Sequence, residues 1–279
     1  MTSPVLAGTL GEHCFTAVKH EGTPAGRVDT IAGVPTYVSD PPPAKTVGKP
    51  RVVLYLADVY GPMYLNNQLV QDYFASQGFN VVGMDYFLGD PVYIHTEPGF
   101  DRPAWMAKSK QQAKELMPGW LKAIREKYGE RCSVCRALPN LLGGILGQDA
   151  HYAATGYCFG APYVLDLAAR GDIVAGALAH PAFLTEDHFK NIKKPLFLSC
   201  AEIDHTFPLE SRRRAEDILI ENKSKYCFQV FSGVSHGFSS RGDPNVGDSR
   251  WAKEECARGI ANWFQRFCGE AEASQSVKL

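Results

Sequence analysis

Three side chains in this sequence have the types and the order needed for nucleophilic catalysis. Cys158 lies at the centre of the pentapeptide GYCFG (156–160), Asp204 follows a run of apolar residues, and His236 follows another. A histidine can take the proton of a thiol, a carboxylate can orient that histidine, and the resulting thiolate can attack a carbonyl carbon. The trio therefore indicates acyl-transfer chemistry, provided that the fold brings the three side chains together.

The glycines of the pentapeptide suit a tight turn between a strand and a helix. The stretch before it (152–155) predicts a short strand, and the run after it (161–170) is compatible with a helix. Gly156 and Gly160 would let the two elements pass closely, while Cys158 takes the strained position at the tip. The first N–H groups of the helix would then lie beside the thiol, where an anion can form. A lone cysteine after a buried strand is usually a small core residue, so the pentapeptide alone leaves both interpretations open.

The segments that carry the acid and the base favour catalysis. Residues 195–201 predict a buried strand that runs into Asp204, and residues 226–231 alternate like a strand that leads to His236. In an open α/β sheet, reactive groups gather outside the carboxyl ends of the strands, where all three side chains fall. The order nucleophile, acid, base is the one found in α/β-hydrolases. The predicted fold class is therefore α/β, an α/β-hydrolase fold with a mostly parallel, doubly wound sheet and helices on both faces.

With these residues in place, the chain resembles the dienelactone hydrolase family, which comprises Cys-nucleophile members of the α/β-hydrolase fold. The matching motifs are GYCFGA (156–161), EID (202–204), SHGF (235–238) and LADVYG (56–61). The resemblance spans the chain from about Val52 to the C-terminal helix. It is most similar to the fungal members, including the N-terminal HEGTP (20–24).

The resemblance implies roles for the residues around Cys158. The backbone N–H groups of Val59 and Phe159 would form the oxyanion hole. A glutamate of the family interacts with the resting thiol, and Asp58, one methylene shorter, stands at that position as a nucleophile-modulating acid. Asp58 could instead cap the helix expected over residues 64–77, because aspartate is a good N-cap.

The same resemblance bears on the substrate. Family enzymes that hydrolyse dienelactone carry an arginine that holds the substrate carboxylate, and Gly89 stands near that position here. Loss of such a bidentate donor weakens the case for that particular substrate. Arg241, which aligns after a one-residue shift, is a candidate for binding a substrate anion. The further substrate-binding candidates are Tyr60, Tyr86 and His180, which follow strand ends.

The expected reaction is hydrolysis of a small ester or lactone through a thioester on Cys158. The same site could alternatively cleave a thioester or a carbon–carbon bond, or catalyse a cyclisation step in a fungal secondary-metabolite pathway. A noncatalytic binding protein of the same fold is a third hypothesis, which the complete trio of Cys158, Asp204 and His236 disfavours.

Composition predicts one compact, cytoplasmic domain over residues 1–279. With 45% hydrophobic residues and a net charge of −1, the chain can bury a large core and gives no reason to expect nucleic acid or an anionic membrane as a partner. No stretch approaches the ~20 apolar residues of a membrane-spanning helix, and no secretory signal is evident. Residues 1–27 are expected to form an irregular covering segment and residues 269–279 a flexible tail, whereas the oligomeric state is left open.

Neither a metal nor a cofactor is predicted. His13, Cys14 and His20 lie close together, but carboxylates with matching spacing are missing, and a covering segment is the favoured interpretation. Cys132 and Cys135 form a C-x-x-C without a second pair, so they are interpreted as structural or incidental.

The remaining elements are predicted from apolar patterns and breakers. An edge strand is expected over residues 30–38, and a helical pattern over residues 106–128 is interrupted at Pro118 and Gly119. The other expected elements are strands at 51–57, 79–84 and 173–179, and helices at 207–220 and 250–267.

Overall fold

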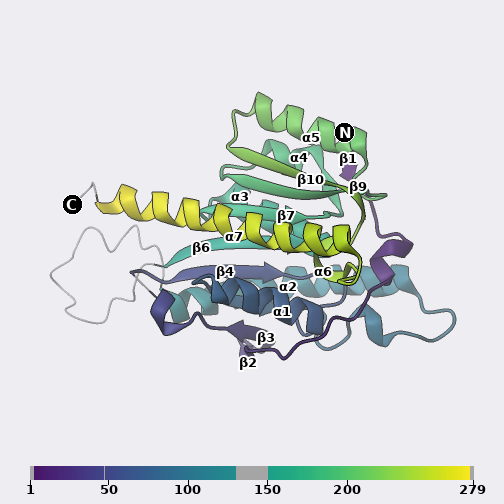
Figure 1. Cartoon of the computed structure of the whole chain (residues 1–279), viewed down its shortest axis with the longest axis horizontal. Coiled ribbons are helices and arrows are strands. Elements are labelled where there is room, and N and C mark those ends of the chain that lie inside the picture. Colours follow the sequence, from purple (N-terminus) through teal and green to yellow (C-terminus); the bar gives the residue numbers. More distant parts are fainter. Residues whose placement is uncertain (1–2, 47, 130–149, 277–279) are drawn as a thin grey trace.

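The structure, a computed structural model, describes residues 3–46, 48–129 and 150–276 (Figure 1). Within these residues, eight strands form one sheet in the order β10-β9-β7-β6-β4-β5-β3-β2. The strands are β2 (Arg27–Ile31), β3 (Val34–Ser39), β4 (Arg51–Leu56), β5 (Asn80–Met84), β6 (His151–Tyr157), β7 (Ala175–Ala179), β9 (Leu196–Ile203) and β10 (Tyr226–Ser235). The six strands from β10 to β5 are parallel, and β3 and β2 add antiparallel partners at one edge.

The central strands are buried on both faces, as their continuous apolar runs require. Every residue of β6 and five of the six residues of β4 are buried. Parallel strands of this kind need a helical layer on each face to keep water from their side chains. In the register of β4 and β6, Leu56 pairs with Gly156, so both strands end at the same edge. This edge receives the segments that carry Asp58 and Cys158.

Helices cover both faces of the sheet, which confirms the predicted fold class (Figure 1). The apolar side chains of α1 (Leu65–Ser76) and α7 (Gly247–Ser276) join one core layer. The other layer is formed with α2 (Arg102–Tyr128), α3 (Ala161–Arg170), α4 (Glu186–Lys190) and α5 (Leu209–Glu221). Among the described helices, none is both long enough and apolar enough to cross a membrane.

Several predicted elements differ from the structure at their boundaries. Residues 30–38 were expected to form a single strand, but β2 and β3 form a hairpin instead, because Ala32 and Gly33 turn the chain with φ of 51° and 78°. The last helix does not end at residue 267. It continues to Ser276, and Arg51 at the start of β4 donates hydrogen bonds of 2.9 and 2.8 Å to Glu272 on its final turns. The helix over 106–128 begins at Arg102 and is continuous through Pro118.

The N-terminal part of the chain crosses the carboxyl edge of the sheet. β1 (Val5–Ala7) pairs with β8 (Leu184–Thr185), and residues 8–20 then pass over the edge with a short 3₁₀ helix at Glu12–Phe15. We call residues 8–20 the N-terminal strap. It is fixed at one end by a 2.6 Å hydrogen bond from the Gly8 N–H to the Thr206 carbonyl. At the other end, the Asn66 amide donates to the Val18 carbonyl at 2.9 Å.

Candidate active site

Cys158 lies on the tight turn between β6 and α3. Its φ is +48°, a left-handed conformation that is costly for a residue with a side chain and that is typical of functional turns. The two flanking glycines are required by close packing. A Cβ on Gly156 would lie 2.7 Å from the Gly160 carbonyl oxygen, and a Cβ on Gly160 would overlap the Leu56 carbonyl group. The pentapeptide is therefore built to hold the thiol at the end of the sheet.

Asp204 and His236 form a buried hydrogen-bonded pair at the ends of β9 and β10. The Nδ1 atom of His236 lies 2.9 and 3.1 Å from the two carboxylate oxygens of Asp204. The Thr206 N–H donates to Asp204 Oδ1 at 2.9 Å, and its hydroxyl lies 2.7 Å from the same oxygen. Burial opposes the charge of Asp204, but the hydrogen bonds from His236 and Thr206 outweigh burial and lower the pKa of this carboxyl.

The ring of His236 also lies close to two thiols. The ligand atoms of Cys14, Cys158 and His236 all lie within 4.8 Å of one another, and all three residues are buried. Among the residues that the structure describes, none makes a hydrogen bond to His236 Nε2. The structure thus brings together the three side chains that the sequence singled out, and it adds Cys14 from the N-terminal strap.

The two thiols share one negative charge. The Sγ atoms of Cys14 and Cys158 are 4.0 Å apart. The hydrogen bond with Cys158, together with nearby His236, lowers the pKa of Cys14 to about 4 although burial opposes this. Burial, followed by the hydrogen bond and charge of Cys14, raises the pKa of Cys158 well above its usual range. The hydrogen bond between the two thiols therefore favours the deprotonated form of Cys14.

His236 is the natural counter-charge for this thiolate. Burial disfavours its protonated form, but hydrogen bonds and charge interactions with Asp204 and Cys14 outweigh burial and raise the pKa of His236 to about 9. At neutral pH the site therefore contains an imidazolium between a carboxylate and a thiolate.

Val59 and Phe159, whose N–H groups are expected to form an oxyanion hole, lie at the same edge of the sheet as Cys158. Leu56 of β4 pairs with Gly156 of β6. Val59 follows Leu56 by three residues and Phe159 follows Gly156 by three, so the two residues leave the sheet at the same level. Both residues are buried, at 0% and 1% exposure. Tyr86 supports this edge, because its hydroxyl donates to the Ala57 carbonyl and its ring lies 5.1 Å from that of Phe159.

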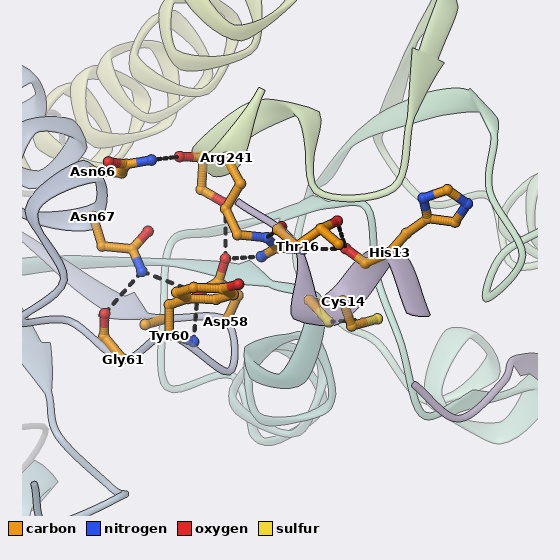
Figure 2. A network of polar contacts seen from close by, with 12 residues as sticks. His13, Cys14, Thr16, Asp58, Tyr60, Gly61, Asn66, Asn67 and Arg241 are labelled. Atoms are coloured by element: carbon orange, nitrogen blue, oxygen red, sulfur yellow. Dashed lines mark hydrogen bonds and ion pairs between the residues drawn. The ribbon is translucent and has the colours of Figure 1, made fainter. Parts of the chain in front are cut away.

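Asp58 is bound to Arg241 (Figure 2). Its Oδ1 accepts hydrogen bonds of 3.0 Å from the Tyr60 N–H and from the Asn67 amide, and its Oδ2 accepts one of 2.8 Å from the Ser240 hydroxyl. The N-cap of α1 is Tyr64, so the alternative interpretation of Asp58 as the cap of this helix is wrong. The carboxylate instead neutralises a buried guanidinium beside the site.

Arg241 also holds the N-terminal strap. Its Nε donates to the Thr16 carbonyl at 3.2 Å, and an Nη donates to the His13 carbonyl at 3.4 Å (Figure 2). Its side chain is only 2% exposed, and the ring of Tyr60 covers it at 5.2 Å. Burial disfavours the charge, but Asp58 and the thiols outweigh burial and raise the pKa of Arg241. The donors that were expected to face a substrate anion are directed at the strap and at Asp58.

The other predicted pocket residues occupy different surroundings. Tyr60 stacks on Tyr93 at 5.9 Å and lines a pocket of about 630 Å³. Tyr86 is fully buried behind Phe159. His180 lies with its ring 4.8 Å from that of His236, and burial lowers the pKa of His180 well below its usual value, so it stays neutral.

Two pockets open on either side of the strap. The pocket that includes Tyr60 is also lined by Phe15 of the strap, whereas a second pocket of about 400 Å³ is lined by His13, Thr16 and His236. Cys14 lies between these strap residues and covers Cys158, which is 0% exposed. The strap thus contributes lining residues to both pockets, while Cys158 is among the lining residues of neither.

Sequence reasoning missed two residues of the site. Thr206 could have been found, because a hydroxyl residue two positions after an aspartate commonly closes a local turn. The sequence groups Cys14 only with the nearby His13 and His20. Its contact with Cys158 spans 144 positions, and no local pattern indicates such a contact. Cys132 and Cys135 lie outside the described residues.

Comparisons with known proteins agree with this geometry. The pattern of the dienelactone hydrolase family matches residues 34–268. Dienlactone hydrolase 1 of Gibberella moniliformis (strain M3125 / FGSC 7600) is 35% identical over 270 residues, which cover 95% of this chain and 96% of that protein. Hydrolase tropI of Talaromyces stipitatus is 34% identical over 258 residues, which cover 92% and 96%. The crystal structure of a proposed dienelactone hydrolase from Klebsiella pneumoniae superposes with a TM-score of 0.66 at 14% identity, over 87% of this chain and 98% of that one.

The structural likeness and the sheet topology show that this protein has the α/β-hydrolase fold. The sequence matches are more specific, because they extend over most of the chain at more than 30% identity. The chain belongs to the dienelactone hydrolase family, whose members are hydrolases, as the sequence resemblance predicted.

Proposed function

We propose that this protein hydrolyses small esters or lactones, with Cys158 as the nucleophile, His236 as the base and Asp204 as the acid that orients it. The observation that supports this most is the position of His236. Its Nδ1 is held by Asp204, its Nε2 is buried without a hydrogen-bond partner among the described residues, and the ring lies close to Cys158 on a strained strand-to-helix turn. This is the relation of nucleophile, base and orienting group that covalent catalysis needs.

The reaction proceeds in two acyl transfers. With Cys14 displaced, Cys158 is a thiolate beside protonated His236, and its sulfur attacks the carbonyl carbon to give a tetrahedral oxyanion. The N–H groups of Val59 and Phe159 donate to that oxyanion, and loss of one such donor costs about 3 kcal/mol in the barrier. His236 protonates the leaving alkoxide as the carbon–oxygen bond breaks. Water, deprotonated by His236, then attacks the thioester and releases the acid and the Cys158 thiol.

Substrate must displace Cys14 before this chemistry can start. Cys158 has no exposed surface, and the thiol of Cys14 lies against it. When the strap moves, Cys158 becomes the thiol nearest to the imidazolium. The favourable interaction of His236 with Cys14 then passes to Cys158, which lowers its pKa and makes it the stronger nucleophile.

The surroundings of the thiol favour a neutral substrate. Gly89 carries no donor for a substrate carboxylate, and Arg241 is already paired with Asp58. The larger pocket is lined by aromatic rings of Tyr60, Tyr93 and Phe100. The similar protein from Gibberella moniliformis is named a dienlactone hydrolase, which supports a lactone or a related ester as the substrate class.

Alkylation with iodoacetamide, read by peptide mass mapping alongside hydrolysis of an activated acetate ester, tests the nucleophile. Labelling of Cys158 should abolish turnover, and the Cys158→Ala variant should have no activity while it unfolds at the temperature of the wild type. Cys256→Ala is the matched control, because Cys256 is equally buried but lies in α7 on the other core layer. Full activity of Cys158→Ala would refute the assignment.

A further inference from the structure

The thiol of Cys14 creates a cluster that hydrolysis does not require. Two cysteine sulfurs and one imidazole converge, with their ligand atoms within 4.8 Å of one another. All three side chains are shielded from water, and the Nε2 atom of His236 has no hydrogen-bond partner among the described residues. A buried polar atom without a partner costs free energy unless a further group satisfies it.

The spacing of the cluster matches tetrahedral zinc. Zn–S and Zn–N bonds of about 2.3 and 2.0 Å place neighbouring ligand atoms about 3.4–3.8 Å apart. The sulfurs of Cys14 and Cys158 are 4.0 Å apart, so small changes of side-chain torsion would bring both to one ion. Thiolate and imidazole ligands together select zinc over calcium or magnesium.

Groups around the cluster suit a metal as well. Asp204 binds the Nδ1 of His236 at 2.9 Å and so directs Nε2 inward, which is the usual support for a zinc-bound histidine. The Nε2 of His205 lies 3.9 Å from the sulfur of Cys14 but is not among the three converging ligand atoms, so its side chain must move to take the fourth position. The strap passes so close to His205 that a Cβ on Gly11 would overlap its ring.

We propose that Cys14, Cys158 and His236, with His205 in the fourth position, form a Zn²⁺ site that is complete only while the N-terminal strap covers the cleft. The ion binds two deprotonated thiols and two neutral imidazoles, and the proton of the remaining thiol and that of the His236 imidazolium pass to solvent. The inhibitory consequence rests on the proposed function, because the metal binds the nucleophile and the base of the hydrolase. Zinc then locks the strap in place and holds the enzyme inactive until a chelator removes it.

Titration calorimetry of the full chain with ZnCl₂, with a phosphine reductant that keeps thiols free, measures the site directly. We expect one equivalent of Zn²⁺ to bind. Co²⁺ should bind at the same site and give thiolate-to-metal absorption in the near ultraviolet, a signature that does not depend on catalysis.

The variants separate this site from other cysteines. Asp204→Asn, which alters only the support of His236, should weaken zinc binding about 10–100-fold. Cys14→Ser removes a ligand and should weaken it more, with loss of the cobalt absorption, and His205→Ala should weaken it as well. Cys227→Ser and the double variant Cys132→Ser/Cys135→Ser should bind zinc as the wild type does. The proposal is overturned if Cys14→Ser keeps wild-type affinity, or if the double variant loses the binding.

Activity is the second readout. Zinc at one equivalent should stop ester hydrolysis, and excess EDTA should restore it. If zinc binds through Cys14 but the protein without metal cleaves no ester, the metal site stands and the proposed function fails. If esters are cleaved but zinc neither binds at Cys14 nor inhibits, the function stands and the metal site fails.

Discussion

Asp58 and Asp204 occupy equivalent places in the fold but have different partners. Each follows a parallel strand, each is buried, and each accepts a hydrogen bond from the N–H two residues ahead, at 3.0 Å from Tyr60 and 2.9 Å from Thr206. Each also interacts with a hydroxyl, that of Ser240 or of Thr206. The same local turn is therefore built twice along one edge of the sheet.

The difference lies in the cation that each carboxylate holds. Both cations come from the connection between β10 and α7, but Asp204 holds His236 and Asp58 holds Arg241. An arginine stays charged at every physiological pH, so the Asp58 pair can only tether the chain. A histidine can gain and lose a proton, so the Asp204 pair can serve a reaction. The partner, and not the aspartate, decides what each site can do.

The largest expected effect comes from neutralising the acid of the proton-transferring pair. Asp204→Asn should lower kcat by about 10⁴-fold, because the amide neither stabilises the imidazolium nor selects the productive tautomer. Steady-state kinetics on an activated ester give the value, and circular dichroism checks that the fold is kept. A kcat within tenfold of the wild type would place Asp204 outside the mechanism.

The second effect concerns the ion pair between Asp58 and Arg241, which tethers the chain. Arg241→Met leaves Asp58 buried without a cation and should lower the free energy of unfolding by about 3–5 kcal/mol, measured by urea denaturation. The double variant Asp58→Asn/Arg241→Met removes the uncompensated charge and should regain most of that loss. If the single variant is as stable as the wild type, the tether contributes nothing and the comparison of the two pairs breaks down.

The smallest effect is a pH dependence that only one pair should show. The pKa of His236 is raised from 6.5 to about 9, so its stabilising contribution is complete below about pH 6.5 and is lost as the pH rises through 9. The lowered pKa of Cys14 adds stability as the pH rises towards 9 and opposes this loss in the wild type. Thermal unfolding temperatures should therefore fall over this window in Cys14→Ser, and much less in the double variant Cys14→Ser/Asp204→Asn. The Arg241 guanidinium stays charged throughout.

The control for this pH series follows from the groups that face His236. Besides Asp204, these are the thiols of Cys14 and Cys158 and the rings of His180 and His205. The Cys14→Ser substitution removes the thiolate that assists protonation of His236. An unchanged slope in the double variant would show that groups other than this pair cause the pH dependence.

The sequence predicted those parts of the site that depend on local patterns. The glycines around Cys158, and the positions of Asp204 and His236 after apolar strands, follow from steric needs and from periodicity within a few residues. The hairpin at Ala32 and Gly33 was missed because it lacks the Asn-Gly or Asp-Gly pair that marks such turns.

Contacts over long sequence separations could not be predicted in this way. The pairing of Asp58 with Arg241 spans 183 positions and has no local sequence pattern, whereas the expected influence of Asp58 on the thiol came from the family pattern alone. Which residue of a covering segment would touch the nucleophile depends on how that segment is anchored, and the anchors are backbone carbonyls of Thr16 and Val18 that carry no sequence signal.

The path of the N-terminal strap has a practical consequence for handling this protein. The residues that cover the nucleophile lie close to the beginning of the chain, and β1 ties them to the body through Val5 and Thr185. An affinity tag, a shifted start codon or proteolytic trimming at this end would alter access to the thiol as well as expression. Two preparations that differ only in their first residues should therefore be treated as two different reagents.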